Sequence, residues 1–146
     1  MYLGRYIVLG LVLLILALTL MDFRLDNLKK VNANQREVFA GTLQFEMFYG
    51  APGFGEDTTQ DEKEPTYILH VNEPFLFRDT SFTSDASYDT VNTIHIRFDP
   101  ASAVNGTNLK KIIGEKIIVE CTLYPAHTGH HHAPAVTEKV FAITKQ

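Results

Sequence analysis

Cysteines and long basic runs are both scarce in this sequence of 146 residues, and each scarcity excludes a class of protein. Cys121 is the only cysteine, so the chain forms no internal disulfide, no Cys-x-x-Cys redox pair and no cysteine-rich zinc site. No basic run is longer than Lys29-Lys30 and the formal charge is −4, which leaves no electrostatic surface for a polyphosphate. We therefore expect no nucleic-acid partner.

Length and composition indicate one compact domain. Hydrophobic residues make up 45% of the chain and charged residues 21%, a balance too apolar for a disordered tail. A chain of 146 residues can bury one sizeable core but scarcely two. We therefore expect neither a disordered tail nor a multidomain enzyme.

An apolar run covers residues 6–21, from Tyr6 to Met21, and is typical of an export signal. As a helix it spans about 24 Å, less than the roughly 30 Å of a bilayer core, so residues 1–21 fit a signal peptide or a short signal anchor. The best cleavage site, Ala17-Leu18-Thr19, has Thr where Ala is preferred, which favours an uncleaved anchor. A buried core helix is the third reading, but the run lacks the polar stripe of a soluble helix.

Residues 22–35 are predicted to be a linker or stalk. Their charges alternate, and Leu25, Leu28 and Val31 recur at spacings of three, which is typical of a short amphipathic helix. The folded β domain is then expected to cover residues 36–146.

This domain is predicted to be mainly β. Apolar residues alternate with polar ones at residues 42–49, 67–71, 75–78, 91–98, 117–123 and 135–143, and these segments are the predicted strands. Pro74 indicates an edge position or a bulge, and Asn108 with Gly114 frames one helical turn. This order predicts a small five- to six-stranded OB-like Greek-key barrel with one short helix, preceded by the N-terminal apolar helix. A β-sandwich is the alternative.

Four histidines between the last two strands are the sharpest candidate site. His127, His130, His131 and His132 lie within six residues, and neutral imidazole is a common ligand of zinc and copper. In an extended segment His130 and His132 point one way and His131 the other. A single zinc or copper ion then needs a further ligand from His95, His70 or an acidic residue.

Two other interpretations of the same loop remain open. Pro125, Gly129 and Pro134 can shape a purely structural loop whose histidines hydrogen-bond the backbone or stack on aromatic rings. The loop can also contact a ligand or a protein, because the loop before the last strand lines the binding face of OB-like barrels.

Other clusters give weaker signals. The acidic residues of the loop after residue 49 lack the spacing of a calcium loop; they are Glu56, Asp57, Asp61, Glu62 and Glu64. Five aromatic residues can form a binding surface or pack in the core; they are Phe48, Tyr49, Phe54, Phe82 and Tyr88. Cys121 alternates in phase with apolar neighbours and is expected to be an inert buried thiol. No nucleophile is paired with a base by sequence, so we expect no enzyme and no catalytic residue.

A family resemblance rests on four segments. They are Gly50-Ala51-Pro52-Gly53-Phe54-Gly55-Glu56-Asp57, Tyr67-Ile68-Leu69 with Pro74 after it, Gly114 before Ile117-Ile118-Val119, and Thr128-Gly129-His130-His131-His132-Ala133-Pro134. Together they resemble an uncharacterised family of exported bacterial domains, a domain of unknown function, over roughly Arg36 to Thr144. The family more often has Thr where this chain has Ala133. The resemblance implies a bacterial, non-cytoplasmic protein and no known activity.

These inferences combine into one functional expectation. We expect a non-catalytic binding or interaction module of the bacterial cell envelope, with a histidine-dependent transition-metal-binding protein as the alternative. The module is expected to be anchored in the inner membrane through residues 6–21 with its domain in the periplasm, or to be secreted to the periplasm if the signal is cleaved. Its partner is expected to be another envelope protein or a small ligand.

Overall fold

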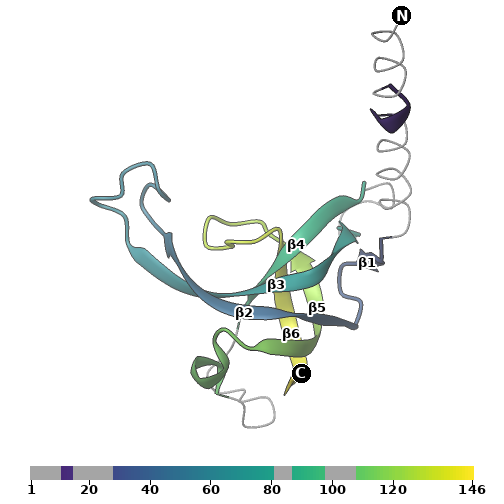
Figure 1. Ribbon diagram of the computed structural model, residues 1–146. Coiled ribbons are helices and arrows are strands. Elements are labelled where there is room, and N and C mark those ends of the chain that lie inside the picture. The colour runs from purple at the N-terminus through teal and green to yellow at the C-terminus, as the bar shows by residue number, and fades with distance from the viewer. Residues whose placement is uncertain (1–10, 15–27, 81–86, 98–107) are drawn as a thin grey trace, which may run out of the picture.

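The computed structural model describes residues 11–14, 28–80, 87–97 and 108–146 of the chain (Figure 1). It contains a short 3-10 helix, η2 (Leu109–Ile112), and six strands. The strands are β1 (Lys30–Asn32), β2 (Glu37–Tyr49), β3 (Lys63–Arg78), β4 (Asp89–Ile96), β5 (Lys116–Pro125) and β6 (Ala135–Lys145).

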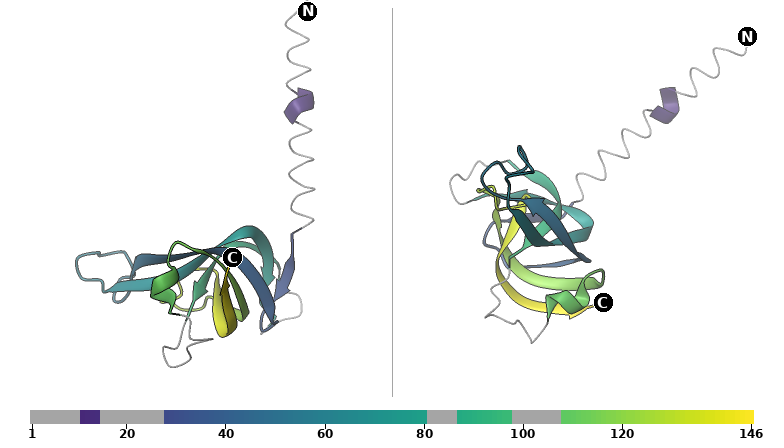
Figure 2. Two further views of the ribbon diagram at one scale, coloured as in Figure 1. Left: turned by 60° about the horizontal axis from the view of Figure 1, so that its bottom comes forward. Right: turned by 90° about the vertical axis from the view of Figure 1, so that its left-hand side faces the viewer.

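Five of the strands close into a barrel, seen from two further sides in Figure 2. β2 pairs antiparallel with both β3 and β5, β5 pairs antiparallel with β6, and β3 pairs antiparallel with β4. A parallel pairing of β4 with β6 completes the circle. This strand order, with its one parallel pair and a short helix before the fourth barrel strand, confirms the OB-like Greek-key barrel. The alternative sandwich is wrong.

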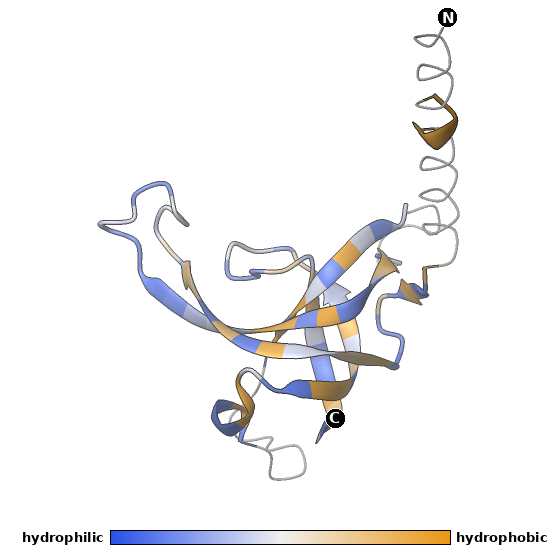
Figure 3. Ribbon diagram, viewed as in Figure 1, coloured by the Kyte–Doolittle hydropathy of each residue, from blue (hydrophilic) through white to orange (hydrophobic). Residues whose placement is uncertain are grey.

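The barrel core follows from the alternation of side chains along each strand, which Figure 3 shows as bands of hydropathy. Leu43 on β2 faces its partner Leu69 on β3, and both are fully buried. Val119 and Cys121 on β5 are also fully buried in this core. Cys121 is therefore buried as predicted, and this burial raises the pKa of its thiol to about 12, which disfavours the reactive thiolate.

β1 is the element that sequence patterning missed. Residues 30–32 were predicted to belong to the linker, but they pair in parallel with Leu76, Phe77 and Arg78 of β3. The spacing of Leu28 and Val31 suggested a helix, whereas Val31 enters the barrel core from an added strand and is fully buried. A three-residue strand is too short to show the alternation that identifies longer ones. The folded unit therefore begins before Arg36.

The remaining local predictions concern Pro74, Asn108 and Gly114. The β3–β4 register shifts between His70 and Phe75, so the bulge predicted at Pro74 is present. The Asn108 side chain accepts the Lys110 N–H at 3.1 Å and caps η2, and Gly114 adopts a φ of +82° at the turn into β5. Asn108 and Gly114 therefore frame the helical turn, as the sequence predicted.

Most of the apolar run at residues 6–21 lies outside the described residues, except for Leu11–Leu14, which are helical. Within the part of the chain that the structure describes, no helix has both the length and the apolar character needed to cross a membrane. Signal-anchor function stays a prediction.

We predict that residues 28–146 fold without the apolar run, because the core side chains that the structure describes all come from within this range. Starting the chain at Arg36 instead should lower the free energy of unfolding by about 2–3 kcal/mol, since it removes β1 and the fully buried Val31. Circular dichroism shows whether each fragment folds, and urea denaturation followed by the same signal gives the free energy of unfolding of each. A helical spectrum, or equal stability of the two fragments, would contradict the prediction.

Candidate functional site

Two loops that are distant in sequence meet on the outer face of the barrel. The β2–β3 loop covers residues 50–62, and the β5–β6 loop, here called the histidine loop, covers residues 126–134. The histidine loop is closed by a hydrogen bond from the Ala126 N–H to the Pro134 carbonyl at 3.0 Å. Gly129 lies against the Phe54 ring so closely that a Cβ built on it would be 2.6 Å from the ring, so only glycine permits this contact.

Glu64, the second residue of β3, holds the histidine loop. One carboxylate oxygen accepts a hydrogen bond from His130 Nδ1, and the other accepts one from His132 Nε2 at 2.8 Å. Burial by itself raises the pKa of the Glu64 carboxyl, but the hydrogen bonds from His132 and His130 outweigh it and lower the pKa below its ordinary value. The carboxylate therefore stays ionised and fixes two of the four predicted histidines.

His95 lies beneath the histidine loop on β4. It alternates with the buried Ile94 and Ile96 and so lies on the outer face of the strand, yet it is only 9% exposed, because the loop covers it. Its Nδ1 accepts the His132 N–H at 3.3 Å, and the two rings stack with centroids 5.9 Å apart. Burial, aided by the positive charges that His132 and His131 can carry, lowers the pKa of His95 to about 4. His95 is thus a neutral imidazole at neutral pH.

The other two histidines of the loop face Tyr124 on β5. His131 Nδ1 accepts the His127 N–H at 3.1 Å, so its Nε2 carries the proton and donates to the Tyr124 hydroxyl at 3.2 Å. Arg97 also donates to this hydroxyl at 2.9 Å. Burial of the His131 ring, then the nearby charges of His127 and Arg97, lowers the pKa of His131.

The structure thus divides the four predicted histidines into two pairs. His130 and His132 meet at Glu64, while His127 and His131 pack against each other with ring centroids 4.7 Å apart. The segment is not extended at this point, because the His131 N–H donates to the Thr128 carbonyl at 3.0 Å and closes a turn. The division into pairs therefore follows from this turn. In residues 28–80, 87–97 and 108–146, no three His, Cys, Asp or Glu side chains stand ready to enclose a metal ion.

The predicted aromatic surface is only partly assembled. Phe48 stacks on His132 at 4.3 Å between centroids, and Phe54 meets the edge of His130 at 5.3 Å and is 45% exposed. Tyr88 instead packs with Arg78 and Lys30 beside β1. Phe82 lies outside the described residues.

An acidic side chain, Asp61, bonds the backbone of the β2–β3 loop. Asp61 is 8% exposed and accepts the N–H groups of Gly53 and Gly55, each at 2.6 Å. Within the predicted acidic loop, Asp61 therefore fixes the backbone on both sides of Phe54.

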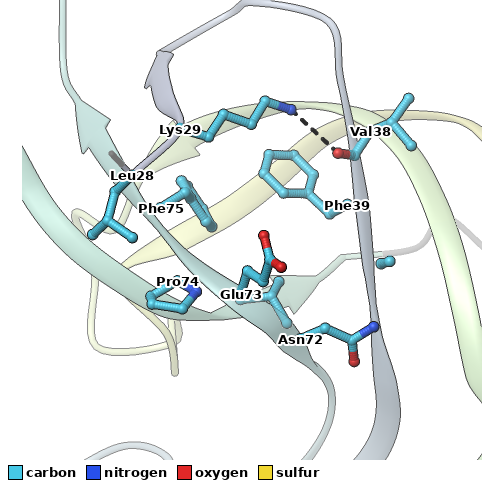
Figure 4. A pocket seen from close by; sticks show the side chains of 10 residues that line it. Leu28, Lys29, Val38, Phe39, Asn72, Glu73, Pro74 and Phe75 are labelled. Atoms are coloured by element: carbon cyan, nitrogen blue, oxygen red, sulfur yellow. Dashed lines mark hydrogen bonds between the residues drawn. The ribbon is translucent and has the colours of Figure 1, made fainter. Parts of the chain in front are cut away.

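A cavity of about 270 Å³ lies elsewhere, beside the β3 bulge (Figure 4). Phe39, Phe75 and Pro74 line it with seven other residues, none of them from the histidine loop. The Lys29 ammonium at its rim lies 2.6 Å from Glu37 and 3.3 Å from the Val38 carbonyl. This cation is already paired, and the cavity is separate from the candidate site.

Sequence reasoning did not single out Glu64 as the centre of the site. It named His95 and an unspecified acidic residue as possible additions to the histidines, but grouped Glu64 with the other carboxylates of its loop. The one local signal is position: Glu64 shares the outer face of its strand with Thr66 and Ile68, whereas the rest of the acidic group precedes the strand.

Acid should destabilise the protein through His95. Between pH 6.5 and pH 5 the unfolded chain protonates this residue and the folded chain does not, so its contribution to the free energy of unfolding falls by about 2 kcal/mol. We expect His95→Asn, which keeps an acceptor for the His132 N–H but does not titrate, to lose correspondingly less stability in urea titrations of the full chain in mild detergent. His127→Asn, an exposed residue of the same loop, is the control and should follow the wild type. Parallel curves for wild type and His95→Asn would refute the buried neutral imidazole.

Comparison with known proteins gives one match. Residues 93–144 match the family model described as Domain of unknown function (DUF4431), a segment that runs from β4 to β6 and contains His95 and the whole histidine loop. No curated protein and no solved structure matches the chain. The resemblance predicted from the sequence is therefore confirmed as a resemblance to a domain of unknown function over about a third of the chain, a segment that holds the histidine loop but not Glu64.

Proposed function

We propose that this chain is a non-catalytic binding module of the bacterial cell envelope whose partner docks where the β2–β3 loop meets the histidine loop. The observation that carries the proposal is the fixed contact between these loops: Glu64 hydrogen-bonds both His130 and His132, and Phe54 packs on Gly129. Strong anchoring of an exposed loop favours recognition, because a preorganised surface loses little entropy on binding.

The exposed groups of this surface suggest its chemistry. Phe54 offers a half-exposed ring, and the His130 side chain is 58% exposed although its Nδ1 is engaged. Arg97 and His127 add polar groups on the far side of Tyr124. Aromatic rings beside hydrogen-bonding groups are typical of binding faces on OB-like barrels and of protein contact sites.

Placement in the envelope is part of the proposal. It is supported by the apolar run at residues 6–21 and by the resemblance to exported domains. The partner is then either another envelope protein or a small ligand, and the membrane contact is made by the run itself.

Site-specific photo-crosslinking in cells tests the docking surface. A benzophenone side chain in place of Phe54 or His130 should give discrete crosslinked products from the envelope fraction. The same side chain at Lys139, which is exposed on β6 away from both loops, is the control and should give none of them. Identical products from all three positions, or none from Phe54 and His130, would refute this surface as the docking site.

A histidine-dependent metal protein is the second candidate, favoured by the meeting of His130 and His132 at one carboxylate. Two imidazoles and a carboxylate are ligands that zinc and copper accept, with Glu64 as the acidic residue that the four-histidine set lacked. An ion held there replaces the two Glu64 hydrogen bonds, because the described side chains do not enclose an ion as they stand.

Calorimetric titration of tag-free protein with zinc or copper at neutral pH tests this candidate. We expect one ion per chain, with binding lost in His130→Ala and His132→Ala and weakened in Glu64→Ala. Glu62→Ala is the matched control, since Glu62 is an exposed carboxylate two residues away. Absence of binding heat in the wild type would remove the metal hypothesis and leave the docking surface in place.

A further inference from the structure

β2 has a free edge at residues 44–49. β5 pairs with β2 only between Glu37 and Thr42, and Leu43 then bonds the turn before β5. Beyond Leu43, β2 pairs with β3 alone as far as Tyr49. Among residues 28–80, 87–97 and 108–146, no strand pairs with the other side of this segment. Figures 1 and 2 show that the hairpin of β2 and β3 reaches beyond the other strands.

The backbone groups that face this edge can be assigned. The Leu43 N–H donates to the Glu115 carbonyl at 3.1 Å, and the Leu43 carbonyl accepts the Gly114 N–H at 2.7 Å, both on the side away from β3. Because backbone groups alternate sides along an antiparallel strand, and the β2–β3 register is unbroken from Gly41 to Tyr49, every second residue after Leu43 points the same way. Phe45, Met47 and Tyr49 therefore present their N–H and C=O groups to the free edge.

The side chains of the same three residues form an exposed apolar stripe. Phe45 is 43% exposed, Met47 57% and Tyr49 38%, and their alternation puts them on one face of the hairpin. Exposed edges are usually protected by lysine, proline or a bulge. This segment contains none of them, and its single charge, Glu46, is already hydrogen-bonded to His70 at 2.5 Å. Nothing on the edge opposes pairing with another strand.

We propose that a second copy of this chain pairs antiparallel with β2 along residues 45–49, around a two-fold axis at Met47. In this register Phe45 lies opposite Tyr49 of the partner subunit, which sets aromatic rings side by side. Glu46 lies opposite Phe48 of the partner subunit, so the two carboxylates avoid each other. An axis at Glu46 places like charges face to face, and an axis at Phe45 or Phe48 shortens the overlap of the two free edges. The self-complementary register is what favours a second copy over an unrelated strand.

Single cysteines test the register in the full chain, since the native Cys121 is buried and unreactive. Met47→Cys should form a disulfide-linked dimer about tenfold faster than Val38→Cys, because Cα atoms of facing residues lie about 5.5 Å apart, within disulfide range. Val38 is the matched control: it is 52% exposed on the same strand, but where β5 pairs with it. Phe45→Cys alone should not crosslink, whereas a mixture of Phe45→Cys and Tyr49→Cys chains should.

The mixture of Phe45→Cys and Tyr49→Cys chains also tests whether the side chain at the two-fold axis contributes to dimer formation. Adding Met47→Lys to both chains places two ammonium groups face to face and should abolish the Phe45–Tyr49 crosslink, while Val38→Lys should leave it unchanged. Circular dichroism checks that each variant keeps the barrel. Equal crosslinking of Met47→Cys and Val38→Cys, or a Phe45→Cys homodimer as abundant as the mixed one, would overturn the proposed pairing.

Discussion

The parallel pairing of β4 with β6 is the constraint on which both the barrel and its candidate site depend. It consists of two residue pairs, Ile94 with Ala135 and His95 with Val136. The first pair closes the core, since both side chains are fully buried. The second sets the start of β6 beside His95, so the histidine loop that precedes β6 has to fold over the outer face of β4. The pairing that closes the barrel therefore also places the histidine loop over His95.

Charge and hydrogen bonding then fix the position of the histidine loop on the outer face of β4. Burying an imidazole favours its neutral form, as at His95, whereas an ionised carboxylate attracts the N–H groups of nearby rings, as at Glu64. His132 connects the two residues, because its backbone N–H bonds His95 and its ring bonds Glu64. His132 is thus held through both its backbone and its ring, and these two hydrogen bonds fix the histidine loop to β4 and to β3.

The two faces of the β2–β3 hairpin make different contacts. On its outer face Phe48 and Glu64 hold the histidine loop. On the opposite face, which points into the core at Leu43, the side chains of Phe45 and Met47 reach solvent because the hairpin runs past the end of the barrel. One alternating pattern therefore supplies a core within the barrel, the contacts to the histidine loop on one side of the hairpin and an apolar stripe on the other.

The sequence by itself determined the local structure. Period-two alternation identified the long strands, Pro74 the bulge, and Asn108 with Gly114 the capped turn, because each depends on neighbouring residues. The division of the histidines into pairs depends on the turn between Thr128 and His131, which the extended geometry assumed from the sequence did not include. Only the tertiary structure recruited Val31 to the core, buried His95 and chose Glu64 from a group of similar carboxylates. These contacts join residues far apart in the chain, Glu64 and His130 being separated by 66 positions, so they form only when barrel closure brings the strands together.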